Sequence, residues 1–216
     1  MTIDIVTVFH NEINRAQAVE LHDAILKYHP TGWRFIVVDN TVRNRGFAKG
    51  CNWGAFHPQA KSPIIGFLNP DTSVDGAFME RVSNALRDPR VVITGSRFAK
   101  PQRELEIWGV QDWVCGAAMF VKRDYFTSAG GFDENFVWAW EETDLIRRAQ
   151  EEGLRTRSIK LPLHHRSPDD DSDEDAEYKR YYFEQGAQRY VRKWRTDRVA
   201  PRAPRRSAGF SGGRRR

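Results

Sequence analysis

Cysteine is scarce in this chain of 216 residues, and long apolar runs are missing. Cys51 and Cys115 are the only two cysteines, which excludes a disulfide framework and favours a reducing compartment such as the cytoplasm. No apolar run approaches the roughly 18 residues that a membrane-spanning helix needs, and residues 113–121 suit a buried strand instead. Because the first residues carry no basic segment, we expect no secretory signal.

Two common nucleotide-binding motifs are also absent. No G-x-G-x-x-G follows the first predicted strand, which argues against a dinucleotide site, and no G-x-x-x-x-G-K-[ST] occurs, which argues against a P-loop. A sugar nucleotidyltransferase should carry a glycine-rich loop with a basic residue directly after its first strand. The segment "FHNEIN" at 9–14 has neither, so this enzyme class remains only an alternative.

Positive charge is concentrated at the C-terminal end. The formal net charge is +5, yet residues 189–216 hold ten Arg and one Lys against a single Asp. The last segment is rich in Pro, Gly, Ser and Arg and has too little apolar surface to order itself. We therefore predict a folded domain over 1–195 and a disordered basic tail over 196–216. The tail is either a solvated end or a weak contact for an anionic membrane surface, which would make the protein peripheral to the membrane. Because the rest of the chain is nearly neutral, we expect no specific nucleic-acid partner.

Strand and helix patterns alternate along the chain. Short apolar runs are followed by segments whose apolar residues recur at helical spacing, as at Ala18, Leu21 and Ile25. This order predicts an α/β fold with a single Rossmann-like, mostly parallel sheet flanked by helices. The predicted strands are 3–9, 34–38, 63–69 and 90–98, and the predicted helices are 15–28, 48–56, 76–87 and 141–153.

Polar clusters follow three of these strands, at 10–12, 39–40 and 69–71. Ligands of open parallel sheets bind at the carboxyl ends of the strands, so we expect the three clusters to meet at one edge. Pro70 fixes the backbone before Asp71, and a carboxylate held there could bind Mg²⁺ or Mn²⁺. A plain Asn-Pro-Asp turn without a metal is the alternative.

Three acids crowd the first turn of the helix predicted at 141–153. The helix dipole favours one or two negative charges there but explains Glu141, Glu142 and Asp144 together less well, because they repel one another. Packed carboxylates raise the pKa of one member and can produce a general base.

Six segments resemble family 2 glycosyltransferases, especially the rhamnosyltransferase and galactofuranosyltransferase-like branch. They are "VTVFHNE", "VVDN", "NRGFAKGCNWG", "FLNPDT", "CGAAMFVKRDYFTSAGGFDENF" and "WEETDLIRRAQEEG", in the family's order. The resemblance covers 3–195. It implies a GT-A fold and metal-dependent, inverting transfer of a sugar from a nucleotide-sugar to a hydroxyl of a glycan, a lipid-linked acceptor or a protein. A catalytically weak nucleotide-sugar or glycan-binding module is an alternative.

The resemblance also implies roles for individual residues. Asn69-Pro70-Asp71 stands in the place of the family's DxD motif, with Asp71 as ligand to Mn²⁺ or Mg²⁺ and Asn69 on the donor. His164, with His165 as the alternate, is expected as a further metal ligand. The donor, expected to be a dTDP- or UDP-sugar, would also contact Phe9, His10, Asn11, Asp39, Asn44, Gly46 and Asn52.

By the same resemblance, Glu142 stands where the family usually has an aspartate as catalytic base. Glu141 is expected to orient the acceptor, and Asp144 to hold the helix start or the acceptor site. Residues 116–126 resemble the strand that lines the acceptor pocket. The tryptophans at 108, 113, 138 and 140 could stack on sugar rings or belong to the core.

Overall fold

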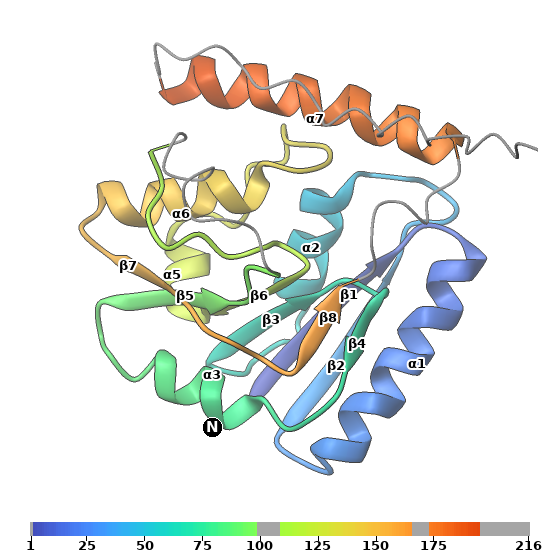
Figure 1. Cartoon of the computed structure of the whole chain (residues 1–216), viewed down its shortest axis with the longest axis vertical. Helices are drawn as coiled ribbons and strands as arrows, with labels where there is room; N and C mark the ends of the chain where they lie inside the picture. Colours follow the sequence, from blue (N-terminus) through green and yellow to red (C-terminus); the bar gives the residue numbers. More distant parts are fainter. Residues whose placement is uncertain (1, 99–108, 166–172, 195–216) are drawn as a thin grey trace, which may run out of the picture.

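The computed structural model describes residues 2–98, 109–165 and 173–194. Its centre is a six-stranded sheet in the order β2–β1–β3–β6–β5–β7 (Figure 1). β6 is antiparallel to both of its neighbours, whereas the other pairings are parallel, which confirms the mostly parallel sheet. The bounds are β1 Ile3–Phe9, β2 Trp33–Asp39, β3 Ile64–Leu68, β5 Val91–Gly95, β6 Ala118–Lys122 and β7 Arg155–Ser158.

Helices cover both faces of this sheet. α2 (Phe47–Ala55), α5 (Arg123–Ser128) and α6 (Glu141–Glu151) pack with Val6 and Val8 of β1 in one core. α1 (Glu12–Tyr28) and α3 (Met79–Ala85) pack with Ile3 and Ile5 in the other. Because successive side chains of a strand point to opposite faces, β1 serves both cores, and all seven of its residues are buried.

Asp4 is the one charged residue of β1, and its carboxylate is fully buried. Arg123 Nη2 lies 2.9 Å from Asp4 Oδ2, and Ser62 donates from its amide and its hydroxyl at 2.7 Å each. A buried charge with this many partners is compensated. Asp4 therefore ties β1 to α5 at the end of the sheet away from the polar clusters.

Two glycines let α2 approach β1 closely. A Cβ at Gly50 would lie 2.7 Å from a methyl group of Val8, and one at Gly54 would lie 2.5 Å from a methyl group of Val6. Side chains larger than hydrogen would push the helix away. The start of α2 is thereby held beside the carboxyl end of β1.

A small second sheet joins two distant segments. β4 (Thr72–Val74) and β8 (Leu163–His165) are antiparallel, with Thr72 opposite His165 and Ser73 opposite His164. β4 begins directly after the turn at 69–71. Its pairing therefore brings the two histidines to that turn from more than ninety residues away.

The last described helix, α7 (Asp173–Trp194), lies across the top of the molecule, above α2 and α6 (Figure 1). Trp140 joins it to the core: its Nε1 donates to the Phe183 carbonyl at 3.1 Å, and its ring centroid lies 5.3 Å from that of Tyr190. The predicted tail at 196–216 and Trp108 lie outside the described residues.

Candidate active site

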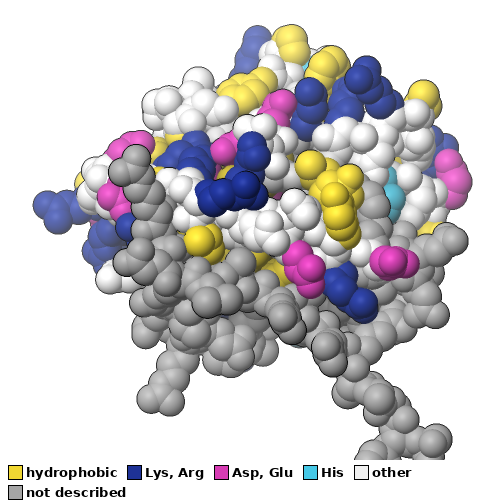
Figure 2. Space-filling model, turned by 90° about the horizontal axis from the view of Figure 1, so that it is seen from above, with side chains coloured by type: hydrophobic (Ala, Val, Ile, Leu, Met, Phe, Trp, Pro, Cys, Tyr) yellow, Lys and Arg dark blue, Asp and Glu magenta, His cyan; other side chains and the backbone are white. Residues whose placement is uncertain are grey.

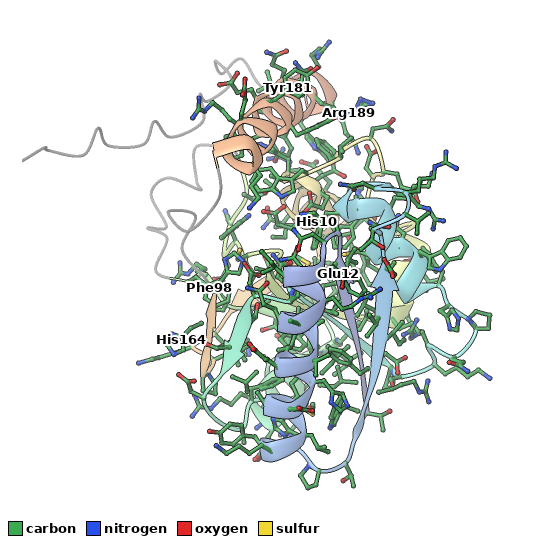
Figure 3. The ribbon with its side chains drawn as sticks, turned by 90° about the vertical axis from the view of Figure 1, so that its right-hand side faces the viewer. His10, Glu12, Phe98, His164, Tyr181 and Arg189 are labelled. Atoms are coloured by element: carbon green, nitrogen blue, oxygen red, sulfur yellow. The ribbon has the colours of Figure 1, made fainter. Side chains whose placement is uncertain are left out.

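A pocket opens at the carboxyl ends of β1, β2 and β3, where the sequence predicts that the polar clusters meet. Of the residues proposed from the sequence, the structure brings His10, Asn44, Gly46, Asn69 and Asp71 together there. Figure 3 shows His10 between the start of α1 and α7. The complete lining is Val8, His10, Asn14, Asn40, Asn44, Gly46, Phe47, Asn69, Pro70, Asp71, Val137, Trp138 and Lys179.

The Asn69–Asp71 turn lines this pocket, and His165 joins it in one polar group although it is not itself part of the lining. His165 Nε2 lies 3.3 Å from Asp71 Oδ1 and 3.3 Å from Asn69 Nδ2. Burial raises the pKa of the Asp71 carboxyl, but the hydrogen bond and charge of His165, with the charge of Lys179, outweigh burial and hold that pKa below its ordinary value. Asp71 is therefore an ionised carboxylate at neutral pH.

His164 lies on the other side of β8. Its Nε2 is 2.9 Å from Asp75 Oδ2, and both side chains are more than 60% exposed; Figure 3 shows it at the outer edge of the strand. Neighbouring strand residues point to opposite faces, so only one of the two histidines can face Asp71. The structure places His165 there, the alternate of the pair.

The opposite wall is the loop that leads into α2. Asn44 Oδ1 accepts a hydrogen bond from the Gly46 amide at 2.9 Å, and Asn40 Nδ2 donates to the Gly46 carbonyl at 3.3 Å. Gly46 has φ +84°, and a Cβ there would lie 2.7 Å from the Val137 carbonyl oxygen. Only glycine fits both the backbone conformation and this close contact.

Four other residues proposed for donor binding are engaged in local structure. Asn11 caps α1 by accepting from the Asn14 amide at 2.8 Å, and Phe9 is buried. Asp39 accepts from Thr41 and from Arg15. Asn52 holds Phe132 by two hydrogen bonds of 2.9 Å, one to its carbonyl and one from its amide. None of the four is among the residues that line the pocket.

Glu141 and Glu142 are buried together at the start of α6, with 3% and 9% exposure. Burial, the charge of Glu142 and a hydrogen bond with Glu142 raise the pKa of Glu141 well above its ordinary value. Protonation of Glu141 is therefore favoured relative to an ordinary glutamate, and Glu142 is the more exposed of the two. Trp140, the N-cap residue directly before the helix, has φ +77°.

A short segment links these acids to the Asp71 turn. A Cβ at Gly116 would lie 3.4 Å from Glu141 Oε1 and 3.5 Å from Glu142 Cβ. The next residue, Ala117, accepts at its carbonyl from the Asn69 amide at 3.1 Å. Glu142 thus stands one short segment away from the pocket, on the side of β6.

Asp144, in contrast, is surrounded by cations. It is fully buried, and its carboxylate accepts from Arg148 Nε at 3.0 Å, Lys193 Nζ at 3.0 Å and Trp194 Nε1 at 3.0 Å. Two of these donors belong to α7. Asp144 therefore fastens α7 to α6, and its carboxylate faces these donors.

Residues 18–150 of the sequence match the family model described as glycosyl transferase family 2. This match spans more than half of the chain. The chain belongs to glycosyl transferase family 2. The matched span includes the Asn69–Asp71 turn and the Glu141–Asp144 cluster, and this family 2 enzyme is a glycosyltransferase.

Solved structures show that the glycosyltransferase has the GT-A fold of enzymes distant in sequence. A mannosyltransferase, PcManGT from Pyrobaculum calidifontis in complex with GDP-Man and Mn²⁺, has TM-score 0.69 and 18% identity over 92% of this chain, which spans 65% of that chain. A Drosophila β1,4-galactosyltransferase 7 mutant with manganese, UDP-Gal and xylobiose has TM-score 0.54 and 17% identity, covering 83% and 80%. Staphylococcus aureus TarS with UDP-GlcNAc has TM-score 0.61 and 11% identity, covering 88% and 67%. No curated protein matches the glycosyltransferase in sequence.

Within the described part of the glycosyltransferase, no three or more His, Cys, Asp or Glu side chains form a ready-made metal cluster. Among the helices that the structure describes, none combines the length and apolarity needed to span a bilayer.

Lys179 of α7 is one of the pocket residues that our sequence reasoning missed, together with Asn14 and Val137. It lies more than a hundred residues after Asp71, beyond an acidic segment, and nothing local to it indicates ligand binding. The available signal is a helical stripe: Lys179 stands four residues before Phe183, which belongs to the buried face of α7. Trp138, a candidate sugar platform, also lines the pocket, whereas Trp113 and Trp140 are buried.

Proposed function

We propose that this family 2 enzyme is a metal-dependent, inverting glycosyltransferase that binds a nucleotide-sugar in the pocket and transfers the sugar to an acceptor hydroxyl. The observation that carries the proposal is the pair of buried amide oxygens in the pocket lining. Asn40 Oδ1 and Asn69 Oδ1 have no hydrogen-bond partner among the described residues. Buried polar atoms are normally paired, so these two acceptors fit a ligand with N–H or O–H groups or a cation.

The residues around Asp71 fit a divalent cation. Carboxylate and amide oxygens suit Mg²⁺ and Mn²⁺, and an imidazole is acceptable to Mn²⁺. We assign Asp71, His165 and the oxygen of Asn69 to this ion, and we set His164 aside because it faces Asp75. When bound, the ion would neutralise the leaving diphosphate. Two of the structural neighbours contain manganese together with a nucleotide-sugar, which supports the assignment.

Glu142 is the proposed general base. A base must accept a proton, and the raised pKa of Glu141 makes that residue the one of the pair that more readily holds a proton, so we assign the role of base to Glu142. Glu142 is also the more exposed member and lies beside Gly116, next to the residue that holds the Asn69 turn. Glutamate is one methylene longer than the aspartate common in the family. The position of α6 must therefore compensate for the longer side chain, so that the carboxylate reaches the acceptor hydroxyl. Glu141 then acts as the protonated neighbour that fixes the geometry.

The donor is best sought with a panel of nucleotide-sugars in the presence of Mn²⁺. The dTDP- and UDP-sugars expected from the rhamnosyltransferase and galactofuranosyltransferase-like branch come first. GDP-mannose is added because PcManGT was solved with it. Thermal shift and release of the nucleoside diphosphate identify the best donor. We propose a cytoplasmic location, with a glycan, a lipid-linked sugar or a protein as acceptor.

The decisive variant is Glu142→Gln, which keeps the shape of the side chain but cannot accept a proton. With the best donor, we expect turnover to fall about 10²–10⁴-fold while donor affinity stays nearly constant. Glu142→Asp should keep part of the activity, because it retains the carboxylate.

The control is Glu141→Gln, which should turn over far better than Glu142→Gln. Normal turnover by Glu142→Gln together with an inactive Glu141→Gln would transfer the role of base to Glu141. Unchanged donor binding by Asp71→Asn in the presence and absence of Mn²⁺ would refute the metal assignment.

A further inference from the structure

The inner face of α7 is a continuous stripe with a lysine at each end. Phe183, Ala187 and Tyr190 pack against Phe136 and Trp140 in a small core of their own. Gly186 sits so close that a Cβ there would lie 2.7 Å from Trp140 Cδ1. Positions 179, 183, 186, 190 and 193 follow the i, i+3/i+4 spacing of one helix face, so Lys179 and Lys193 lie on the same side of α7.

The C-terminal end of this stripe is firmly attached. Lys193 Nζ lies 2.8 Å from Asp133 Oδ2 and 2.8 Å from Asp144 Oδ1. Trp194 adds its indole hydrogen bond to Asp144. A rigid helix rises about 1.5 Å per residue, so an anchor at 193 and an apolar core at 183–190 fix the direction in which residue 179 projects.

That direction brings Lys179 into the donor pocket. It shares the lining with Asp71 and Asn69, which belong to the turn after β3, and with His10, which follows β1. Among the residues that line the pocket, Lys179 is the one Lys or Arg. Figure 2 shows Lys and Arg side chains at several separate places on the face seen from above, with Asp and Glu side chains among them.

A nucleotide-sugar presents a diphosphate with two negative charges to this pocket. Asp71 is an acid and repels that diphosphate unless a cation stands between them. A lysine ammonium is a compact point charge that binds phosphate oxygens through charge-assisted hydrogen bonds.

We infer that Lys179 is a diphosphate-binding residue that α7 supplies to the donor site, acting on the leaving group alongside the Asp71 metal site. The inference rests on the proposed function, because it takes the pocket to be the donor site. It goes further by giving α7 a part in substrate binding and by making donor affinity depend on the docking of that helix.

The probe is inorganic pyrophosphate, because it carries the diphosphate without requiring knowledge of the base or the sugar. Its binding to the full-length protein is measured by titration calorimetry, once with Mn²⁺ and once with a chelator. The variants are Lys179→Met, which keeps the apolar stem, Lys179→Arg, which keeps the charge, and Asp71→Asn. The matched control is Arg180→Met, which removes a neighbouring exposed cation of the same helix that is not part of the pocket lining.

Lys179→Met should bind pyrophosphate about 10- to 100-fold more weakly than wild type, both with Mn²⁺ and with the chelator. Lys179→Arg should recover most of that loss, and Arg180→Met should bind like wild type. Asp71→Asn should lose only the affinity that Mn²⁺ adds. Melting temperatures of both Lys179 variants should match wild type, which separates a lost contact from a displaced helix.

Three results would overturn the inference in different ways. If Asp71→Asn abolishes the Mn²⁺ effect while Lys179→Met binds like Arg180→Met, the donor site stands and Lys179 has no part in it. If the wild-type protein does not bind pyrophosphate under either condition, the donor-site assignment and the inference both fail. If Lys179→Arg binds as weakly as Lys179→Met, the loss does not come from the charge, and the proposed role is wrong.

Discussion

Replacing Asp144 by Asn should release α7 from α6. The carboxylate is fully buried and accepts from Arg148, Lys193 and Trp194. Removing one partner from a buried ion pair costs about 3–5 kcal/mol, because an uncompensated charge remains. Here the lower end applies, since Lys193 keeps Asp133 and Arg148 keeps the Ala129 carbonyl at 2.6 Å.

The expected loss is therefore about 3 kcal/mol, out of a total stability of about 5–15 kcal/mol. For a chain of this size, each kcal/mol shifts the melting temperature by about 2–4 °C, so Asp144→Asn should melt about 6–12 °C lower. Thermal and urea unfolding give the loss. Hydrogen exchange along α7 shows whether that helix is the part that opens.

Glu151→Gln is the matched control. Glu151 pairs with Arg147 on the same helix at the same i, i+4 spacing as the Asp144–Arg148 pair, but its side chain is 52% exposed. Such surface pairs contribute about 0.3–0.5 kcal/mol, so this variant should melt within about 2 °C of wild type. If Asp144→Asn costs no more than Glu151→Gln, the buried cluster does not hold α7. If Asp144→Asn is stable but inactive, Asp144 acts in the chemistry instead.

Two further predictions concern pH. Burial raises the pKa of Asp133, but hydrogen bonds from Lys193 and Asn135 outweigh it and bring the pKa to about 2, below the ordinary 3.8. The stabilising contribution of Asp133 is therefore present above pH 3.8 and is lost as the pH falls towards 2. In Asp133→Asn, the unfolding free energy measured from pH 5 to 2 should fall less steeply than in wild type. An equally steep fall would contradict this. The pKa of Glu141 is raised by burial and by Glu142. The folded state then holds a proton that the unfolded state releases above the ordinary pKa, and stability falls as the pH rises past 4.5. Glu141→Gln should remove that fall and melt higher than wild type at pH 8, and a lower melting temperature there would refute a protonated Glu141.

The elements of the domain could be predicted because they depend on local patterns. The first strand forms at the predicted residues 3–9, since a segment dominated by Ile, Val and Phe suits a strand that is buried on both faces of a sheet. The turn at 69–71 could be predicted to reach the ligand edge for a similar reason, because it directly follows such a strand. The small sheet of β4 and β8 is different, since each strand has three residues and neither forms without the other.

The sequence could not show which of two asparagines in one motif lines the pocket. Asn44 and Asn52 both belong to the segment "NRGFAKGCNWG", yet Asn44 lines the pocket and Asn52 holds the backbone of Phe132. The difference depends on which side of α2 meets a loop that lies 80 residues further along the chain. Hydrophobic periodicity does not report such a partner.

The sequence by itself determined β1, β2, β3 and β5 with the helices between them, the family, and the acids that stand at the carboxyl end of β3 and at the start of α6. These features rest on interactions between residues close in the chain and on motifs with fixed spacing. The tertiary structure decided which histidine faces Asp71, because the choice depends on the register of β8 against β4. It also decided that Lys179 reaches the pocket, because α7 is placed by a buried carboxylate and by aromatic packing from distant segments. Contacts between segments far apart in the chain are fixed only when the whole core packs, and for that reason these two assignments required the structure.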